Sequence, residues 1–138
     1  MDQPAFSDEE RAALARLLAV ILPSTSGPGA TEADAIDYVV GRLHKEDPEI
    51  VVGVRAHLPA AAEDPVAVIA ALASDPTGPG YQVFRRIRAW AWEGFLCDPK
   101  HGGNRDHVGW QRFGIPRSPQ PLGWTVEDLE VVDEGAHP

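Results

Sequence analysis

The chain lacks several features by which a sequence reveals its chemistry. Cys97 is its only cysteine, so an intramolecular disulfide is excluded. It contains no glycine-rich dinucleotide fingerprint, and its two Gly-Pro-Gly segments are not followed by the Gly-Lys-Ser/Thr of a phosphate-binding loop. These absences exclude the usual ways in which a chain holds its own FAD or NAD. We therefore expect no cofactor in this chain.

Positive charge is also scarce. The 12 lysines and arginines face 21 aspartates and glutamates, a formal net charge of −9, and such a surface repels nucleic-acid phosphates and anionic membranes. The longest apolar run, residues 17–22, is too short to cross a bilayer. The first residues are acidic where a secretory signal is basic. We expect a cytoplasmic protein that binds no nucleic acid and does not insert into membranes; the alternative is a periplasmic one, co-exported with a signal-bearing partner.

Apolar residues recur at helical spacing in about five stretches, which predicts an all-α fold. Ser7 and Glu10 form a capping box before the first helix. Prolines stand at the first turns of the third and fourth helices. The fifth helix is apolar around most of its circumference, so it is expected to be central to the fold or pressed against a partner. The expected helices cover residues 8–22, a stretch from a cap at Thr31 to residue 43, and residues 48–58, 66–74 and 81–96.

The C-terminal part of the chain has a different composition. Residues 97–124 contain five glycines and four prolines, so ordering them has a large entropic cost that few internal hydrogen bonds offset. We therefore predict two parts: a small, irregular helical bundle over residues 1–96, and an irregular arm over residues 97–138. The arm is expected to pack on the same domain and on a partner subunit.

Aromatic residues are concentrated near the start of this arm. Eight of the ten lie between Tyr81 and Trp124. We expect Phe84 and Trp90 to be core residues, whereas aromatic and arginine side chains among glycines and prolines are typical of interfaces. Asn and Asp after a glycine pair often fix a turn through their own backbone. The predicted partner-binding residues are Trp92, Asn104, Arg105, Asp106, Trp110, Arg112, Phe113 and Trp124.

Two alternatives concern chemistry in the same loop. His101, Asp106 and His107 carry suitable metal donors, which would make the chain a self-sufficient metal-assisted enzyme. Their spacing matches no strong motif, so loop hydrogen bonds are the favoured role and no metal is expected. Cys97 is expected to be a small buried apolar residue rather than a reactive thiol. Arg105 either pairs with Asp106 or reaches a carboxylate of a partner.

The motif GGNRDHVGW at residues 102–110 is followed by a Gly-x-Pro and comes after a helix that ends in Gly-Phe and an Asp-Pro. This arrangement resembles the C-terminal signature of the gluconate 2-dehydrogenase subunit 3 family. The N-terminal part is similar too: an amphipathic helix runs into Leu22-Pro23, and a Gly-Pro-Gly-Ala turn precedes an acidic helix with Asp37-Tyr38. The resemblance spans residues 8–117, and only residues 102–110 are specific.

Members of that family are the small subunits of membrane-linked, flavin-dependent sugar and polyol dehydrogenases. The resemblance implies a chain without catalytic residues that binds and stabilises a large subunit of the glucose-methanol-choline type. The FAD then belongs to that large subunit. A folding chaperone that leaves its client after cofactor insertion is the third alternative.

Overall fold

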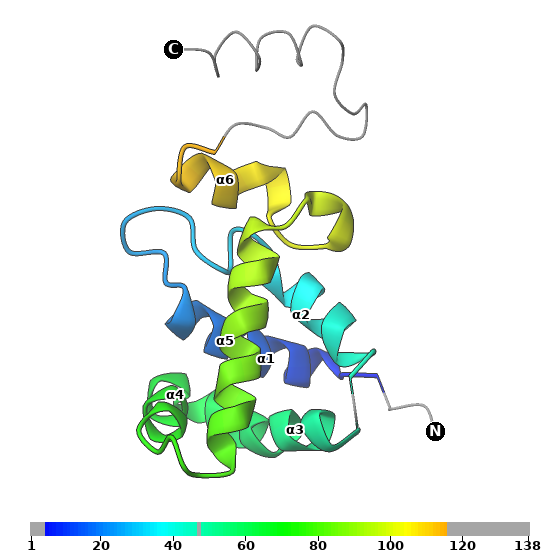
Figure 1. Ribbon diagram of the computed structural model, residues 1–138, viewed down its shortest axis with the longest axis vertical. Coiled ribbons are helices and arrows are strands. Elements are labelled where there is room, and N and C mark those ends of the chain that lie inside the picture. Colours follow the sequence, from blue (N-terminus) through cyan, green and yellow to red (C-terminus); the bar gives the residue numbers. More distant parts are fainter. Residues whose placement is uncertain (1–4, 47, 116–138) are drawn as a thin grey trace, which may run out of the picture.

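The computed structural model describes residues 5–46 and 48–115. These residues form helices and turns without any strand, so the all-α prediction is confirmed for the described part of the chain. Its elements, labelled in Figure 1 where there is room, are α1 (Asp8–Ile21), α2 (Ala35–Leu43), α3 (Pro48–Glu63), α4 (Pro65–Ala73), α5 (Gly80–Leu96), the 3₁₀ turns η1 (Pro99–His101) and η2 (Arg105–His107), and α6 (Val108–Arg112).

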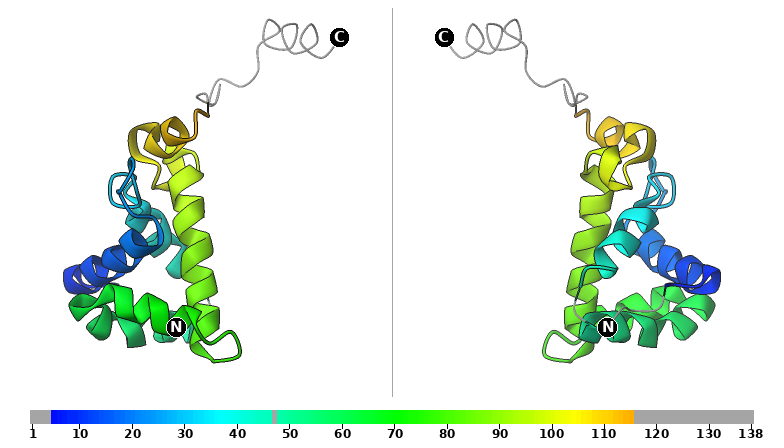
Figure 2. Two further views of the ribbon diagram at one scale, coloured as in Figure 1. Left: turned by 90° about the vertical axis from the view of Figure 1, so that its left-hand side faces the viewer. Right: turned by 90° about the vertical axis from the view of Figure 1, so that its right-hand side faces the viewer.

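Helix α5 is the central element of the bundle. It contacts α1, α2, α3, α4 and α6, and it runs along the long axis of the molecule in Figure 1. Helices α3 and α4 lie at its N-terminal end, whereas α6 lies beyond its C-terminal end, as the side views of Figure 2 also show. The prediction that the fifth helix is central is therefore confirmed.

The hydrophobic core lies between α5 and the four helices before it. Ile87, Trp90 and Phe95 project from one side of α5 and are buried against leucines of α1 and valines of α2 and α3. Trp90 and Phe84 are both buried, as predicted. A helix buried on several sides needs apolar residues around most of its circumference, which is the pattern that α5 has.

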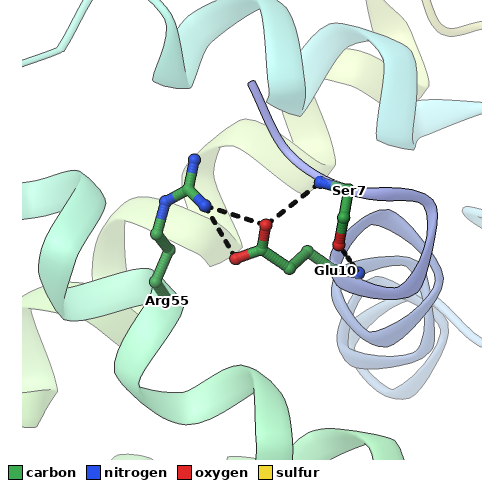
Figure 3. Close-up of polar contacts among 3 residues, drawn as sticks. All are labelled: Ser7, Glu10 and Arg55. Carbon is green, nitrogen blue, oxygen red and sulfur yellow. Dashed lines mark hydrogen bonds and ion pairs between the residues drawn. The ribbon is translucent and has the colours of Figure 1, made fainter. Parts of the chain in front are cut away.

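The start of α1 has the predicted capping box, and the same residues tie α1 to α3 (Figure 3). The Ser7 hydroxyl accepts the Glu10 amide at 3.1 Å, and the Glu10 carboxylate accepts the Ser7 amide at 3.0 Å. The Arg55 guanidinium donates to both Glu10 oxygens at 2.8 Å. The bond from the Ser7 amide, followed by the charge of Arg55, lowers the pKa of Glu10 below its ordinary value of 4.5. The ionised form of Glu10 therefore stabilises the fold.

Two predicted helix boundaries were wrong. Thr31 does not cap α2, which begins at Ala35 after Asp34 in a left-handed conformation (φ 50°). The reason is that the Glu32 carboxylate turns back and accepts the Gly29 amide at 2.7 Å, so residues 30–34 form a turn instead. Helix α3 does not end near Leu58 but continues through Pro59 to Glu63. The alanines that follow Pro59 are strong helix formers.

The arm is more regular than its composition indicates. Residues 97–115, which were expected to be irregular, contain two 3₁₀ turns and the short helix α6. Helix α6 contacts α5 of the helical domain, and the remainder of the arm lies outside the described residues. Within residues 5–46 and 48–115, no helix combines the length and the apolar character that a bilayer crossing requires.

Candidate partner-docking site

The glycine-rich loop lies directly against the last turn of α5. The Asn104 amide donates to the Gly94 carbonyl at 2.7 Å. A Cβ atom on Gly103 would overlap that same carbonyl, and one on Gly109 would overlap the carbonyl of Phe95. Only glycine permits such close backbone contact. The glycines of the motif therefore dock the loop onto the helix.

Asn104 is the polar centre of this loop and is fully buried, with 0% of its surface exposed. Its side-chain Nδ2 donates to the Cys97 carbonyl at 2.7 Å, and its Oδ1 accepts the Gly109 amide at 2.9 Å. A buried amide has to be satisfied in this way because an unpaired polar group costs about 1 to 3 kcal/mol. Asn104 thus holds the two ends of the loop together, and its side chain is not available to a partner.

Three non-glycine residues of the loop have left-handed backbone conformations. Asn104, Asp106 and His107 have φ values of 40°, 54° and 60°. Asn and Asp tolerate this conformation better than most residues, which explains why Asn104 and Asp106 can occupy these positions of the loop. The left-handed His107 directly precedes α6 and starts it.

Two arginines connect the arm to the turn between α1 and α2. Arg105 donates to the Asp34 carboxylate at 2.7 Å and does not pair with Asp106. Its amide also donates to the Ala33 carbonyl at 3.0 Å. Arg112 donates to the Pro28 carbonyl at 2.8 Å. Both predicted interface arginines therefore make contacts within this chain, and the intraloop pair that we considered for Arg105 does not form.

Trp110 belongs to the interior of the loop. Its side chain is 9% exposed, and its indole nitrogen donates to the Leu96 carbonyl at 2.7 Å. The His107 ring stacks on it with centroids 4.9 Å apart. The indole is thus already buried within this chain, which leaves little surface for the partner contact predicted for it.

Among the described residues, the aromatic side chains that stay exposed are Trp92 and Phe113, at 40% and 52%. We call these two residues the aromatic patch. Ile115, two residues beyond Phe113, is 43% exposed. The Trp92 and Phe113 rings are 6.2 Å apart, and both contact the fully buried Phe95 at the same centroid distance. The buried Phe95 ring therefore supports both exposed rings from the core side.

Of the predicted partner-binding residues, Trp92 and Phe113 are brought together here, and Asp106 is exposed in the loop. Trp124 lies outside the described residues. Ile115 was not predicted, although a large apolar residue between Gly114 and a proline was a visible signal.

Two titratable groups near Trp92, those of Tyr38 and Cys97, are neutral at physiological pH. The Tyr38 hydroxyl donates to Glu93 at 2.7 Å; burial, followed by that bond, raises the pKa of Tyr38 to about 12. Burial also raises the pKa of the Cys97 thiol, which donates to the Gly102 carbonyl at 2.9 Å. Cys97 is half-buried rather than fully buried as predicted. A thiol with a raised pKa is a poor nucleophile, because the thiolate is the reactive form.

The structure does not assemble the metal donors considered above. Among the described residues, no group of three or more His, Cys, Asp and Glu side chains could hold a metal ion. His101 is exposed in η1, and His107 stacks on Trp110 instead. The contact with Trp110 therefore explains the position of the His107 ring without a metal ion.

No protein-family model matches this chain, and no curated protein or solved structure is significantly similar to it. The family resemblance thus stays a prediction from the motif.

Proposed function

We propose that this chain is a non-catalytic small subunit that binds and stabilises the FAD-dependent large subunit of a sugar or glycoside oxidoreductase. The observation that carries the proposal is the aromatic patch, in which the Trp92 and Phe113 rings contact each other at a tilt of 33° yet stay about half exposed. The class of the partner comes from the resemblance to the gluconate 2-dehydrogenase subunit 3 family, whose motif lies directly beside the patch.

A preformed aromatic surface is well suited to protein binding. Trp and Arg are enriched among the residues that dominate binding energy, and a surface that is already rigid loses little entropy when it binds. Phe113 is fixed by the short helix before it, which the glycine-rich loop holds against α5. The buried motif residues Gly103, Asn104 and Gly109 thus support the patch and are not themselves exposed. This division of roles is what a small subunit without catalytic residues needs.

The experiment is co-expression of this chain with the glucose-methanol-choline type flavoprotein from the same genome. We expect the two to co-purify in equal amounts, with all flavin absorbance in the large subunit and none in this chain purified alone. Dilution of the complex separates a permanent subunit, which stays bound, from a chaperone, which leaves the finished flavoprotein. Flavin that stays with the isolated chain through gel filtration, or failure to co-purify, would overturn the proposal.

The patch is tested by Trp92→Ala. We expect it to weaken the complex by about 2 kcal/mol, or roughly 30-fold in Kd, as for a buried aromatic at the centre of an interface. Val66→Ala is the matched control, because Val66 is also an exposed apolar residue but lies on α4, at the opposite end of α5. If both variants change Kd by the same factor, the interface does not lie at the aromatic patch.

A further inference from the structure

The outward side of α5 combines positive charge with the aromatic patch. Arg85, Ala89, Trp92 and Leu96 follow one another at intervals of four, three and four residues, which places them in one line along the helix. Arg88 lies one turn before Trp92 on the same side. Both arginines are exposed. The guanidinium groups of Arg85 and Arg88 therefore lie on the same side of α5 as the exposed Trp92 indole.

These two arginines have no carboxylate partner among the described residues, although the whole chain has 21 acidic residues. Arg86, in contrast, pairs with Glu46 at 3.6 Å. Arg88 lies over the Phe84 ring, 5.1 Å from its centroid, which holds the guanidinium against the helix. Glu93, which directly follows Trp92 in the chain, is acidic, but its carboxylate accepts a hydrogen bond from the Tyr38 hydroxyl. The positive charge beside the patch is therefore uncompensated within this part of the chain.

A shallow hollow lies beside Trp92. It is lined by Tyr38, Trp92, Glu93, Leu96 and Cys97. Because Tyr38 and Cys97 stay neutral, Glu93 carries the one charge among the described residues that line this hollow. A space of this kind accepts an apolar side chain.

We propose that the partner reaches this surface with an acidic, apolar segment, in which an apolar side chain packs beside Trp92 and flanking carboxylates pair with Arg85 and Arg88. This inference rests on the proposed function, since the segment belongs to the flavoprotein large subunit. Arginine pairs with carboxylates in two parallel hydrogen bonds, which fixes the orientation of the segment. Charge complementarity at the edge of an interface also speeds association and selects the partner.

A second copy of this chain is a poorer occupant. In a two-fold interface each residue off the axis meets a different residue of the second copy, so an axis through the patch does not by itself supply carboxylates to Arg85 and Arg88. The second copy also carries the same formal net charge of −9, and molecules of like charge repel each other. An acidic segment of another protein brings its carboxylates to the two arginines directly.

The test measures the affinity of the flavoprotein for this chain and for Arg88→Glu, with Arg16→Glu as the matched control. Arg16 is exposed on α1, does not line the hollow beside Trp92, and its reversal changes the net charge by the same amount. We expect Arg88→Glu to raise Kd by about tenfold or more and Arg16→Glu to change it less than about twofold. Salt should weaken the wild-type complex and strengthen that of the double variant Arg85→Glu/Arg88→Glu, because the introduced carboxylates repel the acidic segment and salt screens that repulsion.

Each other outcome overturns the inference in a distinguishable way. A complex that forms normally with both arginine reversals would refute the acidic segment and leave the proposed function intact. Absence of any complex with the wild-type chain would refute the proposed function, and this inference with it. A dimer of the isolated chain that Trp92→Ala dissociates would assign the patch to a second copy. If Trp92→Ala and Arg88→Glu leave affinity unchanged while Trp124→Ala destabilises the isolated chain, residues 116–138 are the occupant.

Discussion

Replacing Trp110 by alanine tests whether the glycine-rich loop is part of this chain's own core. The side chain is 9% exposed and its indole donates to the Leu96 carbonyl. Removing a buried aromatic side chain costs about 3 to 5 kcal/mol. Because Trp110 lies at one end of the core, where neighbours relax into part of the space, we expect a loss of about 3 kcal/mol. That is a large fraction of the roughly 5 to 15 kcal/mol that stabilises a domain.

The assay is thermal and urea unfolding of the isolated chain. A loss of this size should lower Tm by roughly 10 to 15 °C for a chain of this length. Trp110→Phe is the control, because phenylalanine keeps much of the packing but donates no hydrogen bond. It should cost about 1 to 2 kcal/mol, most of it for the unpaired Leu96 carbonyl.

Trp92→Ala should show the opposite behaviour. The Trp92 side chain is 40% exposed and contacts two aromatic rings on one side only. Its loss should destabilise the isolated chain by about 1 kcal/mol, while it weakens the complex. If Trp110→Ala leaves the unfolding midpoint unchanged and weakens the complex instead, the reasoning from burial fails. Trp110 would then be the interface anchor that its sequence context predicts.

The remaining predictions concern the loop backbone and the start of α1. Gly103→Ala should cost about 3 kcal/mol or more in urea unfolding, because its Cβ overlaps the Gly94 carbonyl at a positive φ; Gly114→Ala shares the positive φ but meets no atom, so it should cost only about 1 to 2 kcal/mol. Equal losses would show that backbone strain alone explains these glycines. Glu10→Gln should cost about 1 kcal/mol near neutral pH. Since the folded-state pKa of Glu10 is lowered, this difference is present above 4.5 and disappears as the pH falls through the folded-state value; a difference that persists in acid would refute the ion pair.

The helices could be predicted from the sequence because their signals are local. A capping box spans four residues, and the apolar repeat of a helix is visible within two turns. The same periodicity separates Trp90 from Trp92, since residues two apart on a helix lie on nearly opposite sides, and the structure buries the first and exposes the second. Such features need no knowledge of the rest of the chain.

The errors arise where distant contacts decide the structure. Whether Trp110 is buried depends on a carbonyl 14 residues earlier in the chain, at the end of another helix. Asp34 receives Arg105 from 71 residues away. A periodic pattern in the sequence gives no information about contacts between such distant residues. The sequence therefore indicated that the loop is ordered, but it did not show which loop residues are buried and which are exposed.

The motif at residues 102–110 is used to build the fold, and the aromatic patch lies outside it. Within the motif, Gly103, Asn104, Gly109 and Trp110 are all committed to contacts inside this chain. The exposed rings belong to Phe113, beyond the motif, and to Trp92, before it. Substitution within the motif should therefore reduce stability and affect every partner equally. Substitution of the aromatic patch should change which partner binds while the fold is kept, so a chain that shares only the motif shares the scaffold without necessarily sharing the partner.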